Sequence, residues 1–181
     1  FEKWKETRIN WHRALGFGNE NYRFHVHEKL AHYANAAVDI EYKFPSYGFD
    51  EVEGIHDRSD YDLSQHMKFS GTNLEYTDPY TKEKYIPWIL ETSMGLGRAF
   101  LMVMSDAYSV ETTENGDTRT VLKLKPELAP VKFAVFPLLK NKPELVEKAR
   151  GVFKELSKKY PCEGDDNGNI GKRYRRQDEI G

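Results

Sequence analysis

The chain has 181 residues, of which 39% are hydrophobic and 31% charged, and its formal net charge is −2 at pH 7. This composition is typical of a folded globular protein, and the near-neutral charge gives no overall attraction to nucleic acid. No apolar run approaches the roughly 20 residues that a membrane-spanning helix needs, so we expect no membrane partner. The single cysteine, Cys162, excludes an internal disulfide and a cysteine-based zinc cluster, which suits a reducing cytoplasm.

Two helices and a pair of strands are predicted in the first third of the chain. Residues 1–15 and residues 22–37 are rich in helix-forming residues, and each stretch is predicted to be an amphipathic helix. Residues 38–44 alternate between hydrophobic and polar side chains, which is typical of a half-buried strand. Residues 51–55 resume that alternation after a Ser-Tyr-Gly turn. The two strands are therefore predicted to pair in an antiparallel manner.

A strand, a turn and a helix are predicted next. The strand covers residues 85–91 and runs into a glycine-rich turn at residues 93–98. Apolar residues then follow at helical spacing up to Tyr108, which predicts a buried helix. Asn115 and Gly116 predict a tight hairpin turn between two polar strands.

The character of the sequence changes at Pro126 and Pro130. Residues 131–136 predict a short apolar strand, and Pro143 lies where a following helix would begin. A strand followed by a helix is typical of the start of an α/β domain. We expect an α+β protein with one domain over residues 1–128 and the beginning of another over residues 129–181.

The segment Glu91-Thr92-Ser93-Met94-Gly95-Leu96-Gly97-Arg98 carries the most chemical information. Two glycines after a strand allow close approach of a ligand to the backbone, and an arginine at the start of the next helix can stack on or pair with an anion. A tight strand-to-helix turn without a ligand accounts for the same residues equally well.

The same string resembles motif 3 of the class II aminoacyl-tRNA synthetases, in which a Gly-Leu-Gly-Arg turn leads into a buried helix, and the Glu-Thr-Ser before it resembles the glycyl enzymes. The run from Gly48 to Leu63, with Glu-Val-Glu-Gly-Ile and Arg-Ser-Asp-Tyr-Asp-Leu, is similar to the same family. So are Leu128–Lys132, at the junction of the catalytic and anticodon-binding domains, and residues 171–181 within the second domain. The resemblance implies an antiparallel catalytic sheet with helices, followed by an incomplete α/β anticodon-binding domain.

The resemblance implies the activity of a glycine–tRNA ligase, which uses ATP and Mg²⁺ to form glycyl adenylate and then transfers glycine to tRNA(Gly). It also implies a cytoplasmic homodimer. Motifs 1 and 2 of the family are expected before Phe1, so we expect a partial chain that is inactive in isolation. The alternatives are another class II synthetase, such as the prolyl or threonyl type, and a non-catalytic, synthetase-like protein that binds nucleic acid.

The site residues implied by the resemblance form two overlapping sets. The glycine-binding set is Glu91, Thr92, Ser93, Met94 and Gly95, and the ATP-binding set is Glu51, Val52, Gly95, Leu96, Gly97 and Arg98. Of these, Glu51 and Arg98 would be the catalytic residues, and Glu51 would hold Mg²⁺ through the phosphates of ATP. A carboxylate at Glu91 suits the glycine ammonium, and Ser93 beside the α-carbon would leave no room for a larger side chain.

Arg58 is a further candidate beside the pocket, and an ion pair with Asp60 or Asp62 is the alternative interpretation. The basic run Lys172–Arg176, which contains Tyr174, allows two interpretations as well. It could contact an RNA backbone and stack on a base, or it could pair with the acidic residues that follow it.

The histidines do not predict a metal site. His27 and His32 are five residues apart, which on a helix separates their imidazoles by about 140°. His56 and His66 flank an acidic stretch and are interpreted as solvated histidines of a loop.

Overall fold

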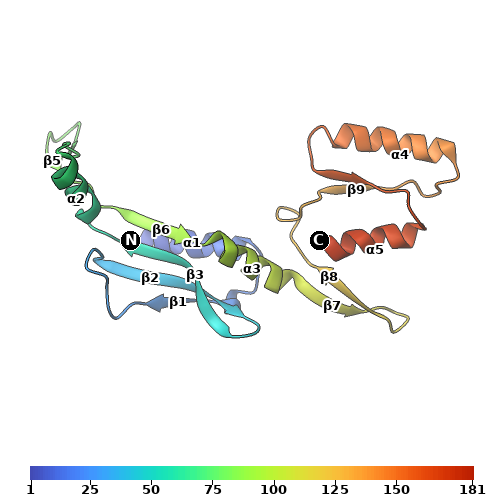
Figure 1. Cartoon of the computed structure of the whole chain (residues 1–181), viewed down its shortest axis with the longest axis horizontal. Helices are drawn as coiled ribbons and strands as arrows, with labels where there is room; N and C mark the ends of the chain where they lie inside the picture. The colour runs from blue at the N-terminus through green and yellow to red at the C-terminus, as the bar shows by residue number, and fades with distance from the viewer. The chain divides into compact units, whose positions relative to one another are not determined.

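The computed structural model describes residues 1–181 and divides into two compact units, Phe1–Met102 and Val103–Gly181 (Figure 1). The division falls within helix α3 (Leu96–Ala107), and the domain boundary expected between residues 128 and 129 stays a prediction. Helices and antiparallel strands occur together in the chain, so the fold class is α+β, as predicted.

The first unit contains a four-stranded antiparallel sheet in the order β1-β2-β3-β6. Its strands are β1 (Tyr22–Val26), β2 (Ala36–Phe44), β3 (Gly48–Asp57) and β6 (Leu90–Met94). The predicted pairing of residues 38–44 with residues 51–55 is confirmed, and Pro45 follows the last residue of β2. The helix predicted over residues 1–15 is also confirmed, as α1 (Glu2–Ala14).

The helix predicted over residues 22–37 is wrong. A short 3₁₀ turn, η1 (Asn19–Asn21), leads instead into β1, which pairs with β2 from Tyr22↔Tyr42 to Val26↔Val38. Helix propensity is a weak local preference of well under 1 kcal/mol per residue for ordinary side chains, and pairing with a distant strand overrides it. The side chain of Tyr22 is buried against Tyr42, with ring centroids 5.5 Å apart.

The strand predicted over residues 85–91 is displaced. Residues 84–85 form β5 (Lys84–Tyr85), which pairs with β4 (Tyr76–Thr77), whereas the sheet strand β6 begins only at Leu90. Pro87 lies between the two strands and has no N–H to donate to a ladder. Helix α2 (Tyr61–Ser70) precedes this hairpin and ends at Gly71, whose φ is +70°.

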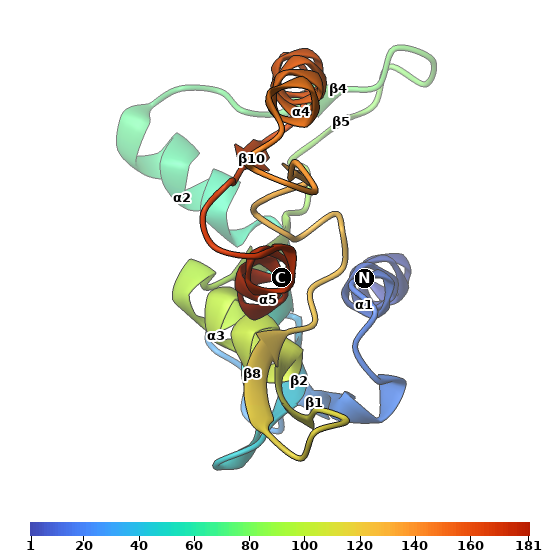
Figure 2. The same cartoon turned by 90° about the vertical axis from the view of Figure 1, so that its right-hand side faces the viewer.

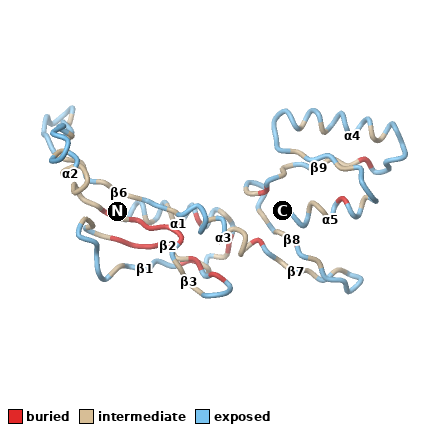
Figure 3. Tube along the Cα trace, viewed as in Figure 1, coloured by how far each residue is buried: buried red, intermediate tan, exposed pale blue.

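The core of the first unit lies on one face of the sheet, where α1 covers it. Ile40, Tyr42, Phe44 and Ile55 are buried there, and Figure 3 shows the buried residues along β2 and β3. Glu53 is buried on the same face with only 1% of its side chain exposed, and it binds two residues of α1. Arg8 donates from Nε and Nη2 to its two carboxylate oxygens at 2.5 and 3.0 Å, and Nε2 of His12 lies 2.8 Å from Oε2.

Helix α3 only partly matches the predicted buried helix. Met102 and Ala107 are buried, but the side chains of Phe100 and Leu101 are 65% and 45% exposed. The apolar spacing therefore predicted the helix correctly. Its prediction that the apolar face is buried is wrong for Phe100 and Leu101. None of the helices in the chain is both long and apolar enough to cross a membrane.

The second unit contains a hairpin and a small parallel strand pair with two helices. The hairpin joins β7 (Tyr108–Thr112) to β8 (Thr118–Leu122) through the predicted turn, where Gly116 has a φ of +84°. Strand β9 (Phe133–Val135) pairs in parallel with β10 (Cys162–Gly164). Helix α4 (Pro143–Leu156), which begins at the predicted proline, packs against both of these strands, and α5 (Ile170–Ile180) packs against β8 (Figure 2).

Helix α5 contains the basic run Lys172–Arg176, and one member of that run is buried. Arg173 is 1% exposed and donates to the backbone carbonyls of Pro137, Asp166, Asn167 and Gly168. Arg176 pairs with Asp165, and Arg175 pairs with Glu179. The second interpretation of this run, pairing with the acidic residues that follow it, therefore describes Arg175 only, while Arg173 holds the loop before α5 in place.

Candidate active site

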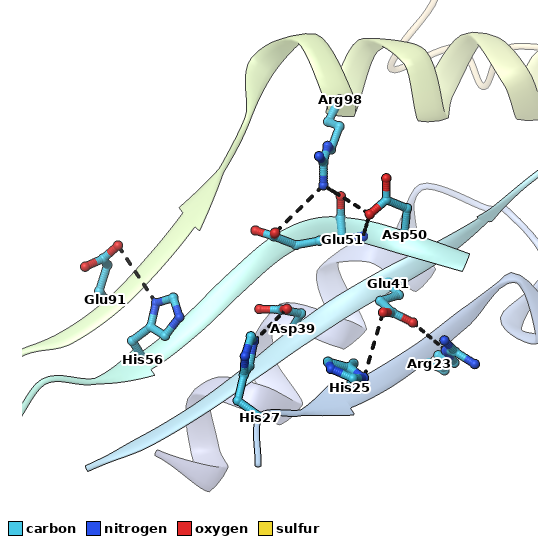
Figure 4. Close-up of polar contacts among 10 residues, drawn as sticks. All are labelled: Arg23, His25, His27, Asp39, Glu41, Asp50, Glu51, His56, Glu91 and Arg98. Atoms are coloured by element: carbon cyan, nitrogen blue, oxygen red, sulfur yellow. Dashed lines mark hydrogen bonds and ion pairs between the residues drawn. The ribbon is translucent and has the colours of Figure 1, made fainter. Parts of the chain in front are cut away.

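The strand register places two of the predicted glycine-binding side chains on the sheet face opposite α1. Glu91 pairs with His56, and Ser93 pairs with Gly54, which in turn pairs with Asp39. Residues directly opposite each other in antiparallel strands project to the same face. Glu91 and Ser93 therefore lie on one face with His56 and Asp39, away from the buried core, as Figure 4 shows for the labelled side chains.

A β-bulge in β3 brings Glu51 to this same face. The register shifts between Ile40, which pairs with Glu53, and Glu41, which pairs with Glu51, so that Val52 is the extra residue. Without the shift, Glu51 and Glu53 would project to the same side, because side chains in a strand alternate with a period of two. With it, Glu53 is buried against α1 while the side chain of Glu51 is 50% exposed.

Arg98, one of the predicted ATP-binding residues, lies beside Glu51. Its Nη1 donates to the backbone oxygen of Glu51 at 2.5 Å and lies 3.8 Å from the Glu51 carboxylate (Figure 4). The same atom is 3.5 Å from Oδ1 of Asp50. The Arg98 side chain is 44% exposed, so its planar guanidinium is accessible from solvent.

Arg58 occupies a fixed position beside Glu91. Its Nη1 donates to Oε2 of Glu91 at 2.9 Å, while Nε and Nη2 donate to the two oxygens of Asp62 at 2.6 and 2.8 Å. The guanidinium carbon also lies 4.1 Å from the centre of the Tyr33 ring. The predicted ion pair with Asp62 is therefore present, and the location of Arg58 beside a substrate pocket stays a prediction.

The electrostatic effects of this arrangement are mutual. The hydrogen bonds that Arg58 donates to the Asp62 carboxylate raise the pKa of Arg58 above its ordinary value and lower the pKa of Asp62. A bidentate pair of this kind fixes the orientation of the guanidinium as well as its charge. Arg58 is therefore held as a cation with one nitrogen directed at Glu91.

The remaining predicted residues are divided between the two faces and the turn. Thr92 and Met94 pair with Ile55 and Glu53, so their side chains project to the α1 face, away from Glu91 and Ser93. Val52 is buried, with 1% of its surface exposed. Gly95, Leu96 and Gly97 form the turn and the first residues of α3, and the Gly95 carbonyl accepts from Ala99.

Three histidines lie on or beside the polar face, and sequence reasoning did not place them there. His27 Nε2 is 2.7 Å from Oδ2 of Asp39, and the His25 ring lies 5.4 Å from the His27 ring. His56 is a strand residue rather than the expected loop histidine, and its buried Nδ1 has no hydrogen bond and lies 4.0 Å from Oε1 of Glu91 (Figure 4). No group of histidine, cysteine, aspartate or glutamate residues is arranged to hold a metal ion.

The site therefore presents carboxylates and two arginines on one sheet face. Glu91 and Glu51 can accept from cationic or polar donors, while Arg58 and Arg98 can bind carboxylate or phosphate oxygens. Sequence reasoning missed Tyr33 because it lies 25 residues before Arg58 and no motif joins them. The location of His56 on this face could have been predicted from the sequence, since His56 is two residues after Gly54 in the same alternating strand.

Comparison with known proteins identifies relatives along the whole chain. The chain is 51% identical to the glycine–tRNA ligase of Chlorobaculum tepidum over 182 residues, covering 100% of this chain and 38% of that protein. It is 53% identical to the glycine–tRNA ligase of Borrelia hermsii, covering 98% of this chain and 41% of that protein. The chain thus spans about two fifths of the length of the curated relatives it matches.

Comparison with solved structures supports the fold. The prolyl-tRNA synthetase of Giardia lamblia, determined in complex with prolyl-adenylate, matches with a TM-score of 0.55 over 88% of this chain and 31% of its own, at 12% identity. At that identity the likeness concerns the fold alone. No family model matches the sequence.

Proposed function

We propose that this chain, which is related along its whole length to part of the glycine–tRNA ligases, supplies the glycine pocket and part of the ATP site of an enzyme that attaches glycine to tRNA(Gly). The observation that carries the proposal is the meeting of Glu91, Ser93, Glu51 and Arg98 on one face of the sheet. Glu51 precedes the segment that contains α2, β4 and β5, whereas Glu91, Ser93 and Arg98 follow it. Their common location is a property of the fold rather than of one local motif.

Glu91 and Ser93 would define the amino-acid pocket. Glu91 would receive the glycine ammonium in a charge-assisted hydrogen bond, and Arg58, beside it, would hold the glycine carboxylate. Ser93 pairs with Gly54, and on that face a Cβ on Gly54 would lie only 2.9 Å from Cε1 of His56. The floor of the pocket is therefore already crowded at this row, which favours the smallest amino acid.

The contribution of Thr92, Met94 and Gly95 to glycine binding would come from the backbone, since the first two project their side chains to the opposite face. Val52, Leu96 and Gly97 would likewise contribute backbone groups around ATP. Backbone groups suit this role because a strand and a turn hold them at fixed positions.

Glu51 and Arg98 would bind the nucleotide. The guanidinium of Arg98 is planar and partly exposed, so it can stack on adenine or pair with a phosphate. Glu51 and the neighbouring Asp50 carry exposed carboxylates, the ligands that Mg²⁺ accepts when ATP phosphates complete its coordination. When bound, Mg²⁺ would neutralise part of the phosphate charge.

The chemistry that these residues would serve has two steps. In the first, a glycine carboxylate oxygen forms a bond to the α-phosphorus of ATP, and pyrophosphate leaves. In the second, a hydroxyl of the terminal ribose of the tRNA forms a bond to the glycyl carbonyl carbon, and AMP leaves. Positioning and charge stabilisation account for catalysis of this kind, and no protein nucleophile is needed.

The proposal extends to the whole protein. It would be a cytoplasmic homodimer with tRNA(Gly), glycine and ATP as its substrates. Lys172, in the basic run of α5, has no ion pair and is the member of that run most available to an RNA phosphate. Arg173 is excluded from such contact by its burial.

The test is amino-acid-dependent exchange of pyrophosphate into ATP by the complete protein that contains this chain. Glycine should support exchange, and alanine, proline and threonine should not. Exchange with one of the larger amino acids but not with glycine would overturn the assignment to glycine. Absence of exchange with every amino acid would favour the non-catalytic alternative.

A further inference from the structure

The imidazole of His56 lies on the polar face of the sheet beside Glu91, and the function proposed above assigns it no role. The two residues pair in the antiparallel ladder between β3 and β6, so their side chains project side by side (Figure 4). Nδ1 of His56 is buried, makes no hydrogen bond and lies 4.0 Å from Oε1 of Glu91. We propose that His56 is a positioning residue, which donates from Nδ1 to Glu91 when glycine binds and so fixes the carboxylate that receives the ammonium. The inference rests on the proposed function.

A buried polar atom without a partner is the first observation that points to His56. Only 24% of its side chain is exposed, and Nδ1 therefore has no bond to water in place of the missing one. The only other buried side-chain nitrogen or oxygen in the chain that lacks a partner is Nδ1 of His12. Because buried polar groups in folded proteins are nearly always hydrogen-bonded, the free Nδ1 of His56 requires a partner that a small movement supplies.

Glu91 offers that partner. Its Oε2 accepts from Arg58 at 2.9 Å, whereas its Oε1 faces His56. A carboxylate has about four acceptor sites, so Oε1 can accept from His56 and still receive the glycine ammonium. The separation of 4.0 Å is about 1 Å longer than a hydrogen bond, a small movement for a long side chain that is 37% exposed. Catalytic hydrogen bonds are often longer in a ligand-free protein than in its substrate complex.

The neighbouring carboxylate does not compete for His56. Asp39 pairs with Gly54 and so lies one row away on the same face, but its Oδ2 is already bonded to Nε2 of His27 at 2.7 Å. The contact with Glu91 is the one ion-pair contact of the His56 ring. Glu91 would then be held through both oxygens, by Arg58 on one side and by His56 on the other.

Gly54 allows the imidazole to occupy this position. A Cβ at residue 54 would lie 2.9 Å from Cε1 and 3.6 Å from Nδ1 of His56, so the ring lies where a side chain at residue 54 would project. Gly54 also pairs with Ser93, the residue to which we assign the exclusion of larger amino acids. The absence of a side chain in this row therefore serves the floor of the pocket and the orientation of Glu91 together.

The direction of the proposed hydrogen bond requires a proton on Nδ1. A neutral imidazole carries one N–H, and its other nitrogen is an acceptor. A bare Nδ1 would turn its lone pair toward the Glu91 carboxylate and repel it, whereas an Nδ1–H attracts the carboxylate. The proton on Nδ1 is therefore a condition of the proposal, and it can be measured.

Nitrogen NMR of the chain itself tests this condition without any enzymatic activity. The two neutral tautomers of histidine differ in the ¹⁵N shifts of Nδ1 and Nε2, and among the six histidines the signals of His56 are those lost in His56→Asn. We expect a proton on Nδ1 of His56 and a shift of the His56 signals in Glu91→Gln. A bare Nδ1, or signals that do not respond to Glu91→Gln, would overturn the proposal even if the complete protein activates glycine.

Two substitutions in the complete protein separate donation from packing. His56→Leu keeps much of the volume over Gly54 but has no donor, whereas His56→Asn is smaller and keeps a side-chain N–H at the place of Nδ1. We expect His56→Leu to raise KM for glycine in pyrophosphate exchange about tenfold, the effect of one hydrogen bond to a charged group. KM for ATP should change little, and His56→Asn should restore most of the loss.

His25→Leu is the matched control for these variants. Nδ1 of His25 lies 4.0 Å from Oε1 of Glu41 on the same face, but this side chain is 52% exposed and its partner is no glycine-binding residue. His25→Leu should therefore leave KM for glycine unchanged. A larger loss in His56→Asn than in His56→Leu, or a KM for glycine equal to that of the parent in both, would overturn the proposal. Absence of glycine-dependent exchange in the parent would instead overturn the proposed function, on which the NMR result does not depend.

Discussion

Arg58 donates from Nη1 to Oε2 of Glu91 over a distance of 2.9 Å, although 33 residues separate the two in the sequence. The contact joins the end of β3 to the start of the last strand of the sheet, and it orients the carboxylate to which we assign the glycine ammonium. Glu91 is thus a positioned acceptor rather than a mobile side chain.

Glu91→Gln should weaken the use of glycine with little effect on ATP. Glutamine has nearly the same shape but replaces a charge-assisted hydrogen bond by a neutral one, and it also loses the ion pair with Arg58. We expect kcat/KM for glycine to fall by a factor that corresponds to about 2 to 4 kcal/mol of transition-state stabilisation, measured by pyrophosphate exchange. Unchanged glycine kinetics would remove Glu91 from the pocket.

Ser93 is tested by a pair of substitutions that differ in volume. Ser93→Ala removes only an oxygen and should leave discrimination against alanine mostly intact, whereas Ser93→Gly should open space and allow alanine to be activated. The measurement is the ratio of kcat/KM for glycine and alanine in exchange. The assignment fails if Ser93→Gly discriminates as strongly as the parent.

Arg98→Lys should raise KM for ATP far more than KM for glycine. Lysine keeps the positive charge but lacks the planar surface that can stack on a base. Arg23→Lys is the matched control, since Arg23 lies on the same face and pairs with Glu41 rather than with Glu51 or Asp50. Equal changes in the two Michaelis constants would place Arg98 elsewhere in the reaction.

Glu53→Gln should destabilise the first unit in a manner that depends on pH. Burial raises the pKa of Glu53, but the hydrogen bonds from His12 and Arg8 outweigh it, so the net pKa is lowered from the ordinary 4.5. A carboxylate with a lowered folded-state pKa stabilises the fold above that ordinary value and loses its contribution as the pH falls through the folded-state pKa. We expect a loss of about 3 kcal/mol at pH 7.

Urea unfolding at pH 7 and at pH 3 measures this effect. The difference between Glu53→Gln and the parent should shrink at the lower pH, because pH 3 lies below the ordinary pKa of 4.5, so part of the stabilisation by the lowered pKa of Glu53 is already lost. Glu51→Gln is the control, because that side chain is half exposed on the same strand and should change stability little. A difference that is independent of pH would mean that packing, rather than charge, stabilises this position.

Arg173→Lys should destabilise the second unit by about 2 kcal/mol, because an ammonium cannot replace a guanidinium fork that donates to several carbonyls at once. Among these bonds, Nη2 reaches the Gly168 carbonyl at 2.8 Å and the Asp166 carbonyl at 3.2 Å. Hydrogen exchange of the amides in residues 133–181 measures the change. Arg175→Lys, on the exposed side of the same helix, should have no comparable effect.

The sequence predicted those parts of the fold in which a local pattern and the tertiary contacts agree. The alternation in residues 38–44, the proline at the start of α4 and the Asn-Gly turn all describe the structure correctly. The stretch 22–37 was predicted wrongly because its strand is stabilised by pairing with β2. Helix propensity is a local property and carries no information about that pairing. The exposure of Phe100 in α3 was also unpredictable. Apolar spacing predicts that a helix has an apolar face, but it does not predict whether another element packs on that face.

The candidate site shows the same division. The motif indicated Glu91, Ser93 and Arg98 as a group, and the structure brings the first two to one face of the sheet. The partners of Arg58 were only partly predictable. Asp62 is four residues away and was foreseen, whereas Tyr33 approaches from a separate loop. Arg173 illustrates the limit most clearly, because a run of basic residues gives no sign that one of them is buried.

The extra residue in β3 makes this strand two half-strands of opposite parity. Upstream of Val52, odd-numbered positions such as Glu51 face the proposed substrates, and downstream of it odd-numbered positions such as Glu53 and Ile55 face the core. Deletion of this one residue would differ from any substitution, because it would remove the bulge and make Glu51 and Glu53 consecutive residues of a regular strand, which still project to opposite sides.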